Sequence, residues 1–147
     1  MDLYLDVDGV IVGCNYAGDK AIIPNIEDIL VYTKKHFRCY WLTTHGRYST
    51  EDVIKYLKLY SPNISQPLFD HIEASRWNTL KTEAIDFTRA FIWIDDQPLQ
   101  SEIQVLKEKD CIRNWLFVDT CQNINNLTVG KIEEKRKELF LHNKSPK

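Results

Sequence analysis

The sequence lacks any apolar run long enough to cross a membrane, because no stretch approaches the roughly 20 residues that a transmembrane helix needs. It also lacks a basic excess, since its formal net charge is −2. We therefore expect no membrane partner, and the net charge gives no support to a nucleic-acid partner, although a local basic patch is compatible with it. The chain starts on a strand-like pattern instead of a basic segment followed by an apolar one, so we expect no secretory leader and a cytoplasmic location.

Paired cysteines are also missing. The chain has four cysteines, and none forms a C-x-x-C pair or a compact cluster in the sequence. A structural zinc site needs ligands paired at short spacing. We therefore expect simple thiols, without a metal or redox role, at Cys14, Cys39, Cys111 and Cys121.

No internal repeat, low-complexity segment or linker divides the chain. Its 147 residues fit one domain, and 44% apolar with 27% charged residues is an ordinary composition for a globular protein. We expect a single domain over residues 1–147, with a frayed lysine-containing end at about 143–147.

What the chain does contain is an alternation of short apolar runs and helical patterns. The apolar runs predict strands at residues 3–8, 37–42, 91–94 and 115–118. Helical periodicity and capping residues predict helices that begin near Pro24 and at Ser49 or Thr50, and others at 78–88, 99–108 and 128–141. Strands that alternate with helices predict an α/β fold, with a parallel sheet covered by helices on both faces. The aromatic residues within these strands are predicted to pack in the core: Tyr40, Trp41, Trp93, Trp115 and Phe117.

Polar clusters follow three of the predicted strands. They are Asp6-x-Asp8-Gly9, Thr43-Thr44 and Asp95-Asp96. In an open α/β sheet, binding sites lie outside the carboxyl ends of the strands. We therefore expect the three clusters to converge at one edge of the sheet, although they are far apart in the sequence.

The acidic pairs suggest a metal site. Side chains two residues apart in an extended strand point the same way, so Asp6 and Asp8 would crowd two carboxylates together. Crowded carboxylates repel unless a cation or proton separates them, and Mg²⁺ prefers carboxylates, waters and phosphate oxygens. Each pair alone is also compatible with a simpler interpretation, an Asp-Gly turn for the first and a helix cap for Asp95-Asp96.

Two further side chains fit phosphate chemistry. A threonine hydroxyl at a strand end can hold a phosphate oxygen without adding charge. Lys81, which the sequence places between the second and third of these strands, supplies a cation that could offset the charge of phosphate and carboxylates. Taken alone, a single lysine is more commonly a solvated surface residue.

The order of these groups along the chain resembles the four sequence motifs of the haloacid dehalogenase (HAD) superfamily. The resemblance covers roughly the first hundred residues, the remainder fits the closing β-α part of the same fold, and its clearest segments are LYLDVDGVI and FIWIDDQP. It implies a single Rossmann-like, three-layer α/β/α domain with a mainly parallel sheet, and Mg²⁺ as the cofactor. It also implies a phosphoryl-transfer enzyme.

The resemblance assigns the two acids of the first motif different roles. Asp6 corresponds to the nucleophile that attacks phosphorus and forms an aspartyl-phosphate. Asp8 corresponds to the general acid and base, and its backbone carbonyl is a magnesium ligand in the superfamily. An acid at the position of Asp8 favours phosphoryl transfer over dehalogenation.

The later motifs imply the remaining roles. Thr43 or Thr44 would hold the transferring phosphoryl group, with Thr43 preferred because it directly follows the apolar run. Lys81 would stabilise the same group. Asp95 would bind Mg²⁺ directly or through water, with Asp96 as the second acid, so the expected metal ligands are Asp6, Asp8, Asp95 and Asp96.

The segments between the motifs leave no room for the cap modules that many superfamily members carry. An uncapped site is open, which in this superfamily goes with macromolecular substrates or with a partner protein that closes the site. The residues that follow the second strand, His45 and Arg47, could contact such a substrate. Equally, His45 could cap the next helix and Arg47 could be solvated.

The sequence thus predicts a Mg²⁺-dependent phosphomonoester hydrolase whose substrate is a nucleotide, a nucleic-acid end or another phosphorylated macromolecule. An alternative is a catalytically weak HAD-fold binding module that works with a partner protein, although the complete acidic set argues against it. A receiver-like phospho-acceptor domain is a third hypothesis. It fits least well, because the threonines and Lys81 precede Asp95, which is the wrong order for that class.

Overall fold

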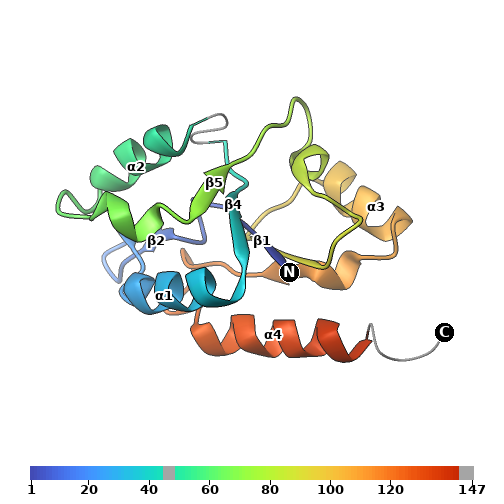
Figure 1. The fold of residues 1–147 in the computed structure, drawn as a ribbon. Coiled ribbons are helices and arrows are strands. Elements are labelled where there is room, and N and C mark those ends of the chain that lie inside the picture. Colours follow the sequence, from blue (N-terminus) through green and yellow to red (C-terminus); the bar gives the residue numbers. More distant parts are fainter. Residues whose placement is uncertain (45–48, 143–147) are drawn as a thin grey trace.

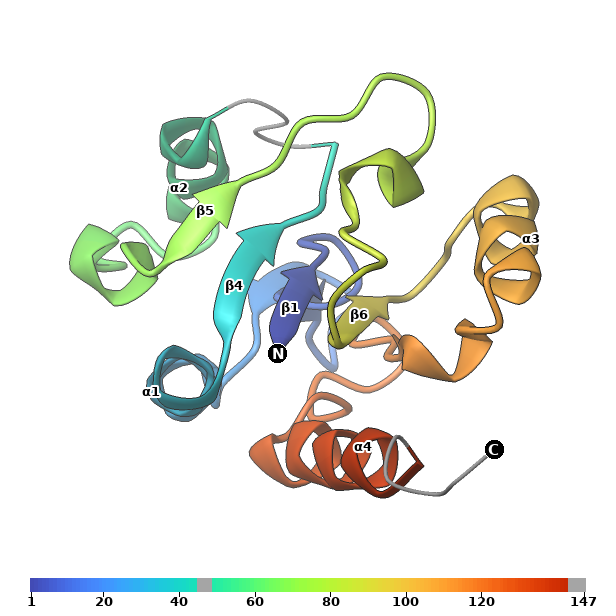
Figure 2. The same ribbon diagram turned by 45° about the vertical axis from the view of Figure 1, so that its right-hand side comes forward.

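A parallel five-stranded sheet forms the centre of the molecule. The computed structural model describes residues 1–44 and 49–142, and the sheet order is β5-β4-β1-β6-β7, with every neighbouring pair parallel. The strands are β1 (Asp2–Leu5), β4 (Arg38–Trp41), β5 (Ile72–Ala74), β6 (Phe91–Asp95) and β7 (Trp115–Phe117). The predicted α/β class and parallel sheet are confirmed, and Figure 2 shows β5, β4, β1 and β6 side by side in this order.

Helices cover both faces of this sheet because side chains alternate along its strands. In β1, Leu3 and Leu5 lie in one core cluster and Tyr4 lies in another. The first cluster includes residues of α1 (Ile26–His36), α2 (Thr50–Lys58) and α4 (Val129–His142). The second cluster includes Leu106 of α3 (Gln100–Glu108). Figure 1 shows α1 and α2 on one side of the strands and α3 on the other.

The helix boundaries largely follow the capping residues in the sequence. Helix α1 begins shortly after Pro24, and α2 begins after Ser49 with two acids in its first turn, where they complement the helix dipole. The Thr128 hydroxyl accepts the Lys131 amide at 3.1 Å at the start of α4, as predicted for a cap. Among the described residues no helix is long and apolar enough to traverse a bilayer.

The helix predicted over residues 78–88 is wrong, because the structure has only a 3₁₀ turn there, η2 (Lys81–Ala84). The Glu83 carboxylate accepts the backbone amides of the three residues before the turn, at 2.7 to 3.4 Å. A side chain that binds nearby amides competes with helical hydrogen bonds, so the chain forms a compact turn instead. The donors are Asn78, Thr79 and Leu80.

Several short elements lie where the sequence suggests only irregular chain. An antiparallel hairpin joins β2 (Val12–Cys14) to β3 (Lys20–Ile22), and its turn is closed by Asn15, whose Oδ1 accepts two backbone amides at 3.0 Å. The 3₁₀ turns η1 (Gln66–Phe69) and η3 (Ile112–Asn114) and the edge strand β5 are also present. Strands of three residues are too short for a period of two to be recognised.

The prediction that the five strand aromatics pack in the core is correct for Trp41 and Trp93, holds in part for the partly buried Tyr40 and Trp115, and is wrong for Phe117. Trp41 and Trp93 are fully buried on opposite faces of the sheet. Trp115 packs against the second core cluster, whereas Phe117, two residues further along edge strand β7, is 54% exposed. Phe117 therefore lies beyond the end of that cluster.

Candidate active site

Three carboxylates gather at the carboxyl ends of two neighbouring strands. Asp6 directly follows β1, and Asp95 is the last residue of β6, with Asp96 next. The Asp6 amide donates to the Ile94 carbonyl at 3.0 Å, which sets the two strand ends side by side. One carboxylate oxygen from each acid lies within 4.8 Å of the others, a spacing that suits one metal ion. The predicted convergence of Asp6 with the Asp95-Asp96 pair is thus present.

Lys81 lies between two of these acids. Its Nζ is 2.6 Å from Asp95 Oδ2 and 3.2 Å from Asp6 Oδ2, and its side chain is largely buried. The other oxygen of each acid accepts a backbone amide: Asp6 Oδ1 from Val7 at 2.8 Å, and Asp95 Oδ1 from Gln97 at 2.8 Å. Both carboxylates are therefore held with their Oδ2 atoms turned towards the ammonium group.

Glu102 of α3 anchors the lysine and was missed by the sequence analysis. Its Oε1 accepts the Lys81 backbone amide at 2.6 Å, and its Oε2 accepts the Leu99 amide at 2.8 Å. The carboxylate is buried, so these donors replace the water it loses. The Leu99-x-x-Glu102 spacing at a helix start was the available signal, because a glutamate three residues after a cap binds the cap amide.

Within the part of the chain that the structure describes, the one ammonium group of Lys81 does not neutralise the three carboxylates. Burial, and then the charge of Asp95, raise the pKa of Asp6 to about 7, and the same two causes raise the pKa of Asp96 to about 6. Burial works against the charge of Lys81, but Asp6 and Asp95 outweigh it and raise the pKa of Lys81. The cluster therefore favours an additional positive charge, either a proton or a cation.

Gly9 allows the first motif to approach the third acid. Its φ is +75°, and a Cβ at this position would lie 2.1 Å from Asp96 Oδ2. Any other residue would displace the Asp96 carboxylate, so the Asp-Gly sequence and the Asp95-Asp96 pair fit together in space.

The Asp8 side chain was expected to point the same way as that of Asp6, and the structure differs. Strand β1 ends at Leu5, and the Val7 carbonyl accepts amides from the residues that follow, so the chain turns before Asp8. The Asp8 side chain is not part of the three-carboxylate group. Instead, its Oδ1 accepts the Tyr56 hydroxyl at 2.5 Å and lies 3.7 Å from Lys20 Nζ. The expected ligation of a metal by the Asp8 carboxylate, together with the other three acids, is therefore not what the structure arranges.

Tyr56 and Lys20 were also missed by the sequence analysis. Lys20 Nζ is 3.3 Å from the Tyr56 hydroxyl, so the two residues and Asp8 form one polar group. Burial and the hydrogen bond to Asp8 raise the pKa of Tyr56, which keeps this phenol a proton donor. Neither residue belongs to a recognisable motif, because Lys20 lies on the short hairpin and Tyr56 reads as part of the apolar face of α2.

The threonines lie at the same end of the sheet. The Leu42 amide donates to the Leu5 carbonyl at 2.8 Å, so Thr43 and Thr44 follow a strand end adjacent to that of β1. Thr43 is buried and Thr44 is exposed. His45 and Arg47, the other expected substrate contacts, lie outside the described residues.

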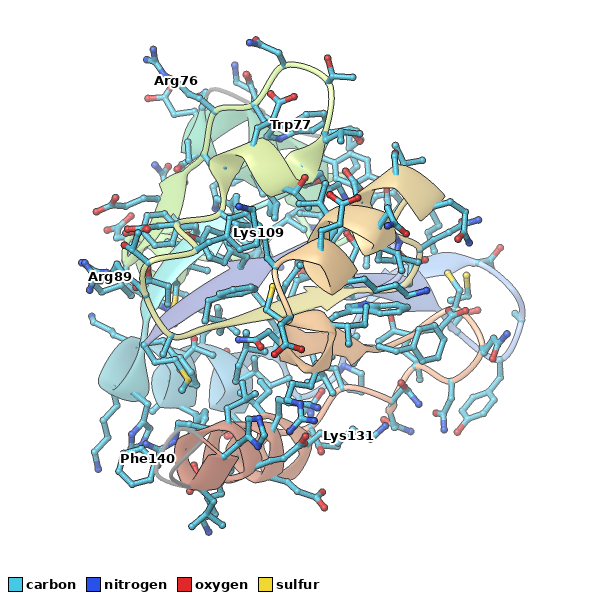
Figure 3. The ribbon with its side chains drawn as sticks, turned by 90° about the vertical axis from the view of Figure 1, so that its right-hand side faces the viewer. Arg76, Trp77, Arg89, Lys109, Lys131 and Phe140 are labelled. Atoms are coloured by element: carbon cyan, nitrogen blue, oxygen red, sulfur yellow. The ribbon has the colours of Figure 1, made fainter. Side chains whose placement is uncertain are left out.

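The loop after β5 borders this end of the molecule. Figure 3 shows Arg76 pointing outward from the loop and Trp77 turned inward, above η2. Trp77 packs against the second core cluster and is only partly exposed.

A search of protein families, of curated proteins and of solved structures returned no match for this chain.

Proposed function

We propose that the protein is a Mg²⁺-dependent phosphomonoester hydrolase that acts through an aspartyl-phosphate on Asp6. The observation that carries the proposal is the gathering of three carboxylates around Lys81 at the carboxyl edge of a parallel sheet. The resemblance of the motifs to those of the HAD superfamily supports the same assignment.

The donor set suits magnesium. Asp6, Asp95 and Asp96 would hold the ion through carboxylate oxygens, together with the backbone carbonyl of Asp8 and water. The raised pKa values of Asp6 and Asp96 support this, because they reveal negative charge that Lys81 leaves uncompensated. When bound, the ion would neutralise phosphate oxygens so that an anionic nucleophile can approach them.

The two steps of the reaction divide between Asp6 and Asp8. Asp6 Oδ2 attacks phosphorus while the bond from phosphorus to the ester oxygen breaks, and protonated Asp8 gives its proton to that oxygen. The alcohol leaves, and Asp8, now a carboxylate, takes a proton from water as the water oxygen attacks the phosphorus. The bond to Asp6 breaks, inorganic phosphate leaves, and Asp6 returns as a carboxylate.

Lys81 and Thr43 act on the phosphoryl group. The Lys81 ammonium lies 3.2 Å from Asp6 Oδ2, so it is close to the oxygens of a group being transferred to that atom. Preorganised charge of this kind stabilises the transition state without reorganisation. The buried Thr43 hydroxyl is the preferred ligand for a phosphoryl oxygen, with exposed Thr44 beside the substrate.

Phosphate release tests the proposal. The wild type and Asp6→Asn would be incubated with an aryl phosphate, mononucleotides and phosphorylated oligonucleotides, each with Mg²⁺ and with a chelator. We expect metal-dependent release by the wild type that is lost in Asp6→Asn, and the panel would rank the substrate classes. Absence of release from every substrate by folded, Mg²⁺-bound protein would contradict the proposal and favour a binding module.

A further inference from the structure

We infer that Tyr56, assisted by Lys20, positions the Asp8 carboxyl for proton transfer to the leaving group. The inference rests on the proposed function and adds two positioning residues to it. Its basis is the contact of three side chains from three separate elements: Asp8 from the turn after β1, Lys20 from β3 and Tyr56 from α2.

The Asp8 carboxyl needs support to hold one orientation. It lies on a turn, its side chain is 41% exposed, and it is separate from the buried acids. An exposed carboxyl on a turn samples several rotamers, whereas proton transfer requires hydrogen-bond distance to one substrate oxygen. A misplacement of about 1 Å at a catalytic group can cost about 100-fold in rate.

Tyr56 is suited to supply that support because its own position is fixed. Val53, Ile54 and Leu57 of α2 are buried in the first core cluster, so the helix is held against the sheet. The Tyr56 ring also packs edge-on against Tyr60, with ring centroids 5.4 Å apart. A rigid phenol that donates a 2.5 Å hydrogen bond constrains the carboxyl more than a flexible cation could.

Both contacts act on the same carboxylate oxygen, because Tyr56 and Lys20 each approach Asp8 Oδ1. Two donors on one oxygen restrain the rotation of the carboxyl group, which is the positioning that the inference requires. Lys20 contributes less than Tyr56, because its side chain is 51% exposed and its distance to Oδ1 is 3.7 Å.

A purely structural role for the hydrogen bond is the competing explanation, and leaving-group chemistry separates the two. A good leaving group such as 4-nitrophenolate departs with little protonation, whereas phenolate and alkoxides depend on the general acid. Loss of a positioning contact therefore slows only the poor leaving groups. Loss of a contact that merely stabilises the fold would affect both in proportion.

The experiment compares single-turnover cleavage of 4-nitrophenyl phosphate and phenyl phosphate by the Mg²⁺-loaded wild type, Tyr56→Phe and Lys20→Met. For Tyr56→Phe we expect about a ten-fold loss with phenyl phosphate and less than about a two-fold loss with the nitro ester. Lys20→Met should show the same selectivity at about three-fold. Because the Lys20 side chain is 51% exposed, its replacement tests the inference even if Tyr56→Phe folds poorly.

Matched controls complete the test. Tyr32→Phe also removes a phenol that donates to a carboxylate, that of Glu133. This pair joins α1 to α4, away from Asp8, so the variant should leave both rates unchanged.

In an Asp8→Asn background, Tyr56→Phe should add no further loss with phenyl phosphate, because the acid it positions is gone. Equal losses on both esters, or additive losses with Asp8→Asn, would overturn the inference while leaving the hydrolase intact. A wild type without turnover would overturn both.

Discussion

The two ends of strand β1 carry buried aspartates in opposite settings. At the amino end, Asp2 Oδ1 accepts Nε and a terminal nitrogen of Arg38 at 3.0 and 2.6 Å, and Oδ2 lies 3.4 Å from Arg89. At the carboxyl end, Asp6 shares the single ammonium group of Lys81 with Asp95, and Asp96 lies nearby. Among residues 1–44 and 49–142, the Asp2 carboxylate has two cations, whereas the three carboxylates at the other end share one.

This difference separates a structural acid from a functional one. Removing a buried charge that is matched by its partners destabilises the fold, and nothing further is gained by binding an ion there. A buried cluster whose charges are unmatched costs stability, and such a cost is typical of sites that bind or react. The imbalance at the Asp6 end, more than burial or acidity alone, therefore identifies the candidate site.

The largest expected effect is on turnover, when Asp6 and Asp2 are each replaced by asparagine in separate variants. Asp6→Asn should reduce aryl phosphate turnover by at least about 1,000-fold, because the nucleophile is lost. Asp2→Asn should leave kcat within about two-fold, since Asp2 lies at the other end of the strand. Turnover measured with Mg²⁺ for both variants, after circular dichroism confirms folding, checks this. Equal losses in the two variants would contradict the functional distinction.

The second prediction concerns the free energy of unfolding, for which the loss of Asp2 is the costly substitution. Asp2→Asn should lower the free energy of unfolding by about 2 kcal/mol, because it removes charge-assisted hydrogen bonds from Arg38 while the arginine, half exposed, can still be hydrated. Urea denaturation at pH 7 measures this loss. An unchanged midpoint would show that Asp2 is not held by its arginines in solution.

The third prediction concerns pH in the metal-free protein. Because the pKa of Asp6 is raised to about 7 in the folded state, its protonation stabilises the fold. That stability is fully present below about pH 4, where the unfolded chain is also protonated, and is lost as the pH rises through 7. The raised pKa of Asp96, about 6, acts in the same direction.

Asp6→Asn should therefore be more stable than the wild type at pH 8 in the presence of a chelator, by about 2 kcal/mol. This gain is net of the lost ion pair with Lys81. The difference should shrink at pH 4 and when Mg²⁺ is added to the wild type. Thermal unfolding at the two pH values measures this difference. A variant less stable than the wild type at pH 8 would contradict the claim that the negative charge around Asp6 is unbalanced.

The smallest effect is expected at Gly9. Gly9→Ala would push against Asp96 Oδ2 and should weaken Mg²⁺ binding by about ten-fold, measured by calorimetry. Gly18→Ala is the matched control, because Gly18 also has a positive φ of +83° but has no atom within 4 Å of the added Cβ. If both variants lose the same affinity, backbone strain and not displacement of Asp96 is responsible.

The sequence predicted the part of the site that follows from sheet geometry. Asp6 and Asp95 converge because they end neighbouring parallel strands, and apolar runs that stop at acids are visible without a structure. Lys81 was identified as well, but on a predicted helix that is in fact a 3₁₀ turn. Its position depends on Glu83 and Glu102, whose carboxylates bind backbone amides, and such contacts leave little trace in hydrophobic periodicity.

The surroundings of Asp8 could not be predicted for a different physical reason. Lys20 lies on the β2–β3 hairpin and Tyr56 lies on α2, so their contacts with Asp8 depend on how these elements pack. Strands of three residues carry too little pattern to place Lys20. A half-buried tyrosine on an amphipathic helix is most simply read as a core residue.

The most direct test of the central claim, that Asp6 is a metal-dependent nucleophile, is to trap the phosphoryl group on it. Asp8→Asn would be mixed with 4-nitrophenyl phosphate and Mg²⁺, quenched in acid and analysed by mass spectrometry of its peptides. The good leaving group permits the first step, and loss of the base slows attack by water, so the intermediate should accumulate. We expect phosphate on Asp6 that is absent with a chelator. Phosphate on another residue, or its absence despite release of nitrophenol, would contradict the account.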